Sequence, residues 1–112
     1  METQTFDLSS LGDRDLGFCV HLARLQGEAV AFWRPLGAAC ALALDERAKR
    51  GEDGALFPFP DNLTLADAAL VCSELLLVIC KLGANRSPDL LNFLQALRVA
   101  AGQQASTRAQ LN

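Results

Sequence analysis

Three charged residues recur at seven-residue spacing inside the most apolar stretch of the chain, residues 65–82: Asp67, Glu74 and Lys81. A carboxylate on an otherwise apolar helix costs free energy unless it is ion-paired or hydrogen-bonded, and helical bundles do build metal sites from such groups. Those sites usually need several ligands side by side, at Glu-x-x-Glu or Glu-x-x-His spacing, which this chain lacks. The spacing therefore favours a solvated or ion-paired edge of a helix.

The alternative is a small ligand-binding or hydrolytic site on Asp67 and Glu74, for which Mg²⁺ is a suitable ion, with Lys81 and His21 as further ligand-binding residues. His21 is the only histidine and shares a helical stripe with Arg14. No motif places a nucleophile or carboxylate beside it, so the stripe favours a solvated surface. The chain also has no glycine-rich phosphate loop and no nucleophile elbow. We therefore expect a non-enzymatic protein with no cofactor and no bound metal.

Composition points to an all-α fold, because Leu and Ala dominate while Val and Ile are scarce and Tyr is absent. Local signals mark the helix starts: Ser10 with Asp13 and Thr64 with Asp67 resemble capping boxes. Pro35 can open a helix but disfavours its interior, and Ser87 precedes a second such proline. These signals predict a compact antiparallel bundle of four helices near 10–33, 35–50, 64–82 and 87–101, with residues 64–82 as its central and most buried helix.

The domain organisation follows from the same pattern. At 112 residues the chain has the length of one domain. We expect an irregular lead-in over residues 1–9, a single helical-bundle domain over 10–102, and a polar, disordered tail over 103–112.

Residues 56–60, Leu-Phe-Pro-Phe-Pro, form an extended strap, because each proline fixes its own φ and pushes the preceding residue towards β or polyproline geometry. Phe57 and Phe59 therefore need a surface on which to pack. The sequence favours a strap whose rings seal the core, and the alternative is a partner-binding element or a lid.

The four cysteines all lie within apolar helical patterns, where free cysteine behaves as a small hydrophobic residue. No Cys-x-x-Cys pair and no secretory leader pattern is present. We therefore expect reduced thiols and a cytoplasmic location.

Charge argues against two classes of partner. The net charge is −3 with both signs interspersed, so no basic footprint for nucleic acid emerges. Asn92, Gln95 and Arg98 superficially suit a recognition helix, but few basic residues lie near them to bind phosphates. The charged side chains of Asp67, Glu74 and Lys81, which we call the seam, argue against a membrane span over residues 65–82. We expect neither a nucleic-acid nor a membrane partner.

The apolar content, 51% before the eight glycines are counted, exceeds that of a typical globular domain. Such an excess predicts that some apolar surface is covered by self-association or by a partner. We expect an adaptor, inhibitor or regulatory subunit that acts through an apolar helical surface, and a homodimer in solution. The residues expected at the partner or dimer contact are Leu22, Leu25, Trp33, Phe57 and Phe59.

Overall fold

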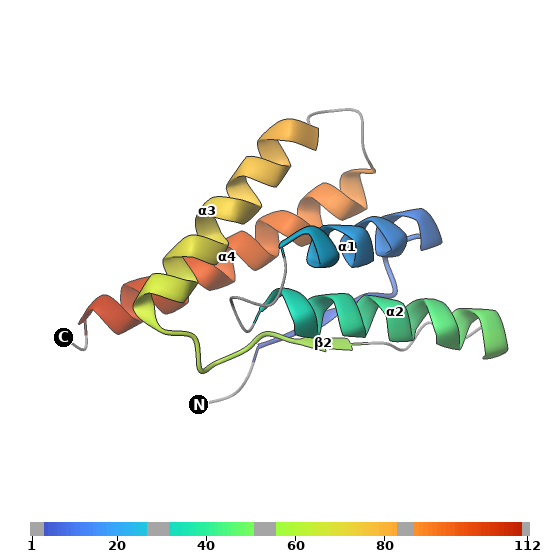
Figure 1. The fold of residues 1–112 in the computed structure, drawn as a ribbon, viewed down its shortest axis with the longest axis horizontal. Coiled ribbons are helices and arrows are strands. Elements are labelled where there is room, and N and C mark those ends of the chain that lie inside the picture. Colours follow the sequence, from blue (N-terminus) through green and yellow to red (C-terminus); the bar gives the residue numbers. More distant parts are fainter. Residues whose placement is uncertain (1–3, 27–31, 51–55, 83–86, 111–112) are drawn as a thin grey trace. The chain divides into compact units, whose positions relative to one another are not determined.

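The computed structural model describes residues 4–26, 32–50, 56–82 and 87–110, and over these ranges the chain forms four helices and two short strands (Figure 1). In chain order they are β1 (Thr5–Asp7), α1 (Asp13–Gln26), α2 (Trp33–Arg50), β2 (Leu56–Pro58), α3 (Leu65–Leu82) and α4 (Pro88–Gln110). The predicted all-α class is confirmed.

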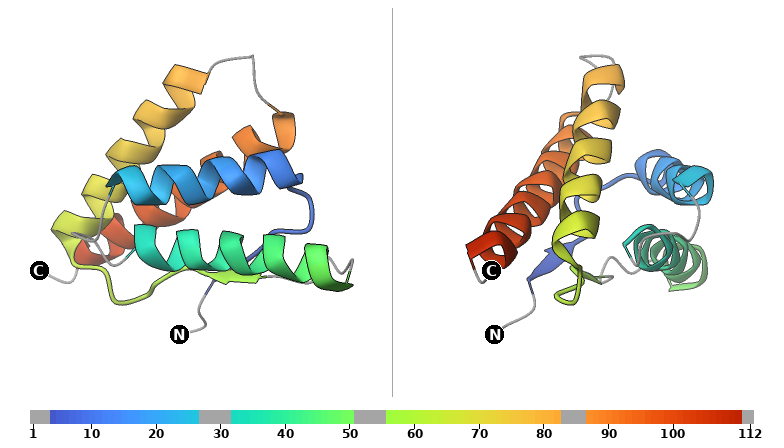
Figure 2. Two further views of the ribbon diagram at one scale, coloured as in Figure 1. Left: turned by 45° about the vertical axis from the view of Figure 1, so that its right-hand side comes forward. Right: turned by 60° about the vertical axis from the view of Figure 1, so that its left-hand side comes forward.

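The helices pack as two pairs, α1 with α2 and α3 with α4. Within each pair the two helices run in opposite directions (Figures 1 and 2). The pairs belong to two compact units, residues 1–59 and 60–112. The placement of residues 10–102 in a single domain stays a prediction.

Close contact between α1 and α2 builds the first unit. A Cβ placed on Gly37 of α2 would lie only 2.7 Å from the Cβ of Ala23 on α1, which is too short for two carbon atoms. The missing side chain at Gly37 therefore sets how closely the two helices approach. Their shared core includes the buried side chains of Leu16, Cys19, Leu22, Leu36, Cys40 and Ala43.

This contact predicts opposite effects for two glycine-to-alanine substitutions. Gly37→Ala should lower the free energy of unfolding by about 1–2 kcal/mol, because overpacking costs about 1–3 kcal/mol and outweighs the gain of up to about 1 kcal/mol in helix propensity. Gly17→Ala is the matched control, since Gly17 also lies in a helix and nothing stands within 4 Å of its added Cβ. It should be stabilising. Urea unfolding measures both, and Ala23→Gly should relieve the cost of Gly37→Ala.

An aromatic cluster closes the other side of α2. The strands pair antiparallel with Phe6 opposite Phe57, and the Phe59 amide donates to the Gln4 carbonyl at 2.7 Å. Alternate residues of a strand share one face, so Phe57 and Phe59 are both buried. Both rings contact Phe32, with centroids 5.9 and 5.4 Å away. The interpretation of residues 56–60 as a strap whose rings seal a core is confirmed.

The described residues near the start of the chain include a short strand that the sequence did not predict. Residues 1–9 were expected to be irregular, but Thr5–Asp7 form β1 because the extended strap offers them a strand edge. Leu8 and Leu11 are buried, and a hydrogen bond from the Leu11 amide to the Leu8 carbonyl closes a turn between them. Arg47 of α2 holds this turn, since its guanidinium donates to the Leu8 carbonyl at 3.2 Å and pairs with Asp13 at 3.0 Å.

The helix predicted near 10–33 differs from α1 at both of its ends, and its residues 27–31 lie outside the described ranges. The first helical hydrogen bond of α1 is accepted by the Gly12 carbonyl, so Ser10 lies before the helix. Trp33 opens α2 instead of closing α1, because the Phe32 carbonyl accepts from the Leu36 amide. Pro35 then falls in the first turn of α2, where no intrahelical partner for its nitrogen is needed.

Both helices of the second unit begin where their caps predict. The Thr64 hydroxyl accepts from the Asp67 amide at 3.1 Å, and the Ser87 carbonyl accepts from the Leu91 amide at 3.1 Å. The prediction that residues 64–82 form the most buried helix is wrong, however. Three residues of α3 are buried, Ala68, Val71 and Leu75, against six in α4. Because α3 packs on α4 along one side, much of its remaining apolar surface is exposed.

Of the tail predicted over residues 103–112, the described part is helical, since α4 continues without a break to Gln110, and residues 111–112 lie outside the described ranges. Two polar residues of the tail bind the segment that precedes α3. Gln104 accepts from the Leu63 amide at 3.1 Å and donates to the Pro60 carbonyl at 2.8 Å. Arg108 donates to the carbonyls of Leu63 and Asp61 at 3.2 and 2.9 Å. These long-range bonds give a polar sequence a structural role.

Candidate functional site

The seam of Asp67, Glu74 and Lys81 runs along α3 as the sequence predicts, but the helix keeps its members apart. Seven residues of α-helix rise by about 10.5 Å, so neighbouring members of the seam lie about two turns from each other. Asp67 and Glu74 are half-buried and Lys81 is exposed. A Mg²⁺ ion has ligands about 2.1 Å away, and Asp67 and Glu74 are too far apart to share one.

The rest of the described chain offers no metal site either, because no three His, Cys, Asp or Glu residues in these ranges are grouped closely enough to hold an ion. His21 lies exposed on α1, in the first unit, whereas the seam belongs to the second unit. The ligand-binding alternative therefore gains no geometric support from the residues predicted for it.

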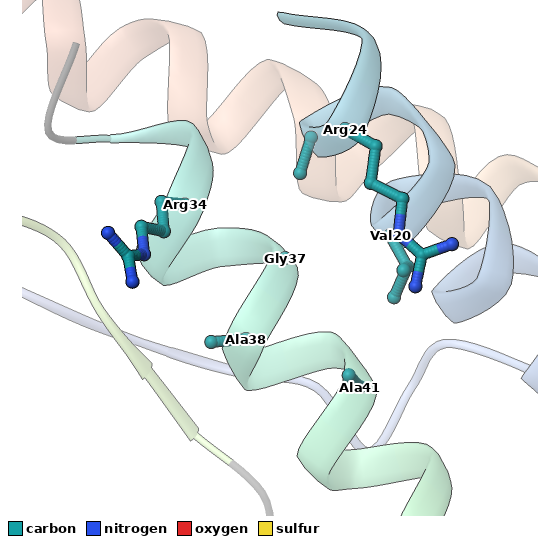
Figure 3. Close-up of a pocket in the computed structure, with 7 residues that line it drawn as sticks. Val20, Arg24, Arg34, Gly37, Ala38 and Ala41 are labelled. Carbon is teal, nitrogen blue, oxygen red and sulfur yellow. The ribbon is translucent and has the colours of Figure 1, made fainter. Parts of the chain in front are cut away.

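A groove between α1 and α2 is a feature that sequence reasoning missed. Its volume is about 440 Å³, and its lining residues are Val20, Ala23, Arg24, Arg34, Gly37, Ala38 and Ala41. Figure 3 shows the guanidinium groups of Arg24 and Arg34 on different helices, pointing away from each other. Ligand sites usually combine an apolar lining with a few converging polar groups. The groove has an apolar lining, but its two arginine side chains do not converge on one point. The small residues Gly37, Ala38 and Ala41 of α2 are the sequence signal that could have revealed it.

The cysteines differ sharply in their surroundings. Cys19 and Cys40 are fully buried between α1 and α2, whereas Cys72 is half-buried and Cys80 is exposed on α3, and all four are free thiols. The hydrogen bond with the Cys40 thiol, together with burial, raises the pKa of the Cys19 thiol above its ordinary value. Cys19 therefore stays protonated and unreactive in the folded protein, because the thiolate is the nucleophile.

This difference predicts an order of alkylation. At low protein concentration and neutral pH, iodoacetamide should modify Cys80 first and Cys72 more slowly, while Cys19 and Cys40 react only when the chain unfolds. Peptide mass spectrometry after timed quenching measures the four rates, and a sample in denaturant gives the unprotected rates as a control. Equal rates for Cys19 and Cys80 in the folded protein would contradict the packing of α1 on α2.

Most residues predicted for a partner contact lie inside the first unit. Leu22, Trp33, Phe57 and Phe59 are buried, with at most 6% of any of them exposed. These side chains form part of the core, because α1, α2 and the strap enclose them. They are therefore not accessible to a partner. Leu25 alone remains, at 70% exposed.

The accessible apolar surface gathers instead on α3, where Leu65, Leu70, Leu76 and Leu77 are 38–60% exposed. On a helical wheel of 100° per residue, Leu70 and Leu77 lie on the side opposite Ala68, Val71 and Leu75, which are the buried residues of α3, whereas Leu65 and Leu76 lie on the flank between these two sides. We call the α3 face the five exposed residues that follow alternating four- and three-residue steps along this side, namely Ala66, Leu70, Ser73, Leu77 and Cys80.

Comparison with known proteins finds no matching family model, no matching curated protein and no matching solved structure. Among the described residues, no helix is both long and apolar enough to cross a membrane. The surfaces of the chain itself are therefore the basis for a functional proposal.

Proposed function

We propose that this chain is a non-enzymatic protein–protein interaction module whose contact surface is the α3 face. The observation that carries the proposal is the exposure of four leucines on α3, of which Leu70 and Leu77 belong to the α3 face and Leu65 and Leu76 lie on its apolar flank. Single exposed leucines are ordinary on a protein surface, but several exposed leucines on one helix are typical of a contact site.

The exposed area is large enough to matter energetically. Together, the exposed fractions of Leu65, Leu70, Leu76 and Leu77 amount to about two whole leucine side chains. Fully burying one leucine contributes about 1.5–3 kcal/mol, so a partner that covers both the α3 face and its apolar flank gains roughly 3–6 kcal/mol from these residues alone. Such a gain supports reversible association, because part of it offsets the lost freedom of the two partners.

A homodimer is the simplest partner consistent with this surface, since two-fold pairing is the commonest form of assembly. A cytoplasmic location remains part of the proposal, and the free cysteines support it. An adaptor, inhibitor or regulatory subunit would each use such a surface.

The test uses one substitution on the α3 face and one on another helix. Leu77→Asp places a charge on a residue that is 60% exposed, and Leu42→Asp does the same at a residue of α2 that is 56% exposed. Each variant is checked by circular dichroism and then used to recover associated proteins from the native cell. Loss of association with Leu77→Asp alone supports the proposal. Equal association by the two variants would contradict it.

A thermal-shift screen with Mg²⁺ and nucleotides separates this function from the small-ligand alternative. A ligand present at 100 times its dissociation constant stabilises a protein by about 2.7 kcal/mol. A stabilising ligand whose effect disappears in Glu74→Gln would favour a binding site on the seam over an interaction module.

A further inference from the structure

We propose that the α3 face pairs with a second copy of this chain, with the two α3 helices antiparallel about a two-fold axis. The inference rests on the proposed function and specifies its partner and its geometry. It is carried by the order of large, small and charged residues along α3.

The α3 face alternates large and small side chains. Leu70 and Leu77 stand seven residues apart, and Ala66, Ser73 and Cys80 follow the same interval between and beyond them. Seven-residue repeats with alternating steps of three and four are the pattern by which two helices pack along their length. An antiparallel pair places Leu70 of one copy against Cys80 of the other, and Leu77 against Ser73, so each layer combines one large and one small side chain.

The flanks of the face decide between the two possible orientations. One flank is the seam of Asp67, Glu74 and Lys81, and the other is apolar, with Ala69 and Leu76. In a parallel pair the charged flank of one helix lies against the apolar flank of the other, which leaves charges beside leucine. In an antiparallel pair each flank meets its own kind.

Antiparallel pairing also brings opposite charges together. Asp67 lies in the first turn of α3 and Lys81 in the last, so Asp67 of each copy falls beside Lys81 of the other. Glu74 lies nearest to the axis, where the two copies bring like charges together, which weakens the pairing without changing its direction. Charge complementarity at the two ends therefore selects a second, inverted copy as the occupant of this face.

The first experiment locates the contact by sedimentation velocity across a concentration series. The wild-type chain should change from 12.0 kDa monomer to dimer as its concentration rises. Leu77→Asp should weaken dimerisation at least 100-fold, and Leu42→Asp should leave it within about 2-fold. A wild-type chain that stays monomeric, or a dimer that survives Leu77→Asp, would overturn the proposal.

The second experiment tests the orientation with two charge variants. In Asp67→Lys both ends of α3 are basic, and in Lys81→Asp both are acidic, so each variant alone should dimerise about 10-fold more weakly than the wild type. A mixture of the two should form a heterodimer near wild-type affinity, because the antiparallel arrangement then pairs opposite charges at both ends. Labelling each variant with a different fluorophore on an added N-terminal tag lets energy transfer report the heterodimer.

Matched controls remove the effect of net charge. Asp89→Lys and Lys49→Asp change the charge by the same amounts at exposed residues of α4 and α2, outside the α3 face and its flanks. They should dimerise like the wild type, with no preference for the mixture. Loss of dimer in Leu77→Asp without heterodimer preference in the charge variants would overturn the antiparallel pairing while leaving the α3 face as the contact site of the proposed function.

Discussion

Replacing Phe32 by alanine should lower the free energy of unfolding by about 3–5 kcal/mol, the range typical of a buried phenylalanine. Phe32 is fully buried and its ring contacts three others, with centroids 4.9 Å from Trp33, 5.9 Å from Phe57 and 5.4 Å from Phe59. Aromatic pairs add about 0.5–1.5 kcal/mol each beyond the area they bury. Losing this ring therefore opens a cavity at the junction of α2 and the strap.

Trp33 is a built-in probe for this experiment, because it is the only tryptophan and packs edge-on against Phe32. Urea unfolding followed by its fluorescence should give a lower midpoint for Phe32→Ala, and the folded emission should shift to the red as water enters. Phe32→Leu, which keeps most of the volume, should lose less. Leu25→Ala is the matched control at a residue that is 70% exposed, and should stay within about 0.5 kcal/mol of the wild type. A loss no larger than that of Leu25→Ala would contradict the aromatic cluster.

The second large effect is expected when the polar bonds of the predicted tail are removed. Gln104→Ala combined with Arg108→Ala should lower the free energy of unfolding by about 3 kcal/mol. Four hydrogen bonds to residues 60–63 disappear, and the part-buried Leu63 amide loses its acceptor. A single unsatisfied donor costs about 1–3 kcal/mol, and bonds from a charged guanidinium contribute about 1.5–3 kcal/mol.

Hydrogen exchange makes this prediction specific to one group. The Leu63 amide should be protected in the wild type and should exchange much faster in Gln104→Ala, while Gln104→Glu keeps an acceptor for it and should retain protection. Gln103→Ala is the matched control, because Gln103 is an exposed neighbour on the same helix. If Gln104→Ala and Gln103→Ala behaved alike, the last turns of α4 would be as weakly held as their composition suggests.

The hydrogen bonds of Gln104 and Arg108 also predict the effect of shortening the chain. A protein that ends at Gly102 keeps all the buried apolar residues of α4, which lie between Leu90 and Ala101, but it loses the partners of the segment that leads into α3. Such a truncation removes a polar anchor without touching the apolar core. We expect it to loosen the start of the helix that carries the α3 face.

The sequence by itself determined the helical class and the starts of α3 and α4. The caps at Thr64 and Ser87 act on amides within four residues of themselves, so their chemistry can be recognised without any tertiary contact. The strap was predictable for the same reason, because each proline fixes its own backbone and that of its neighbour. Burial of Phe57 and Phe59 then follows from their size and their alternation.

Only the tertiary structure decided the features that depend on distant residues. Thr5–Asp7 form a strand because residues 56–58 lie beside them, and α4 continues to Gln110 while its polar residues bind carbonyls more than forty positions away. The absence of a side chain at Gly37 matters because Ala23 of the neighbouring helix lies against it, and no local sequence pattern indicates this contact.

The candidate site shows the same division. The sequence marks α3 as apolar nearly all round, and a helical wheel cannot say which arc is covered. The position of α4 decides this, because it buries the side of Ala68, Val71 and Leu75 and leaves Leu70 and Leu77 exposed. Periodicity fixes which residues share a face, whereas the neighbour that packs on the helix fixes which face remains for a partner.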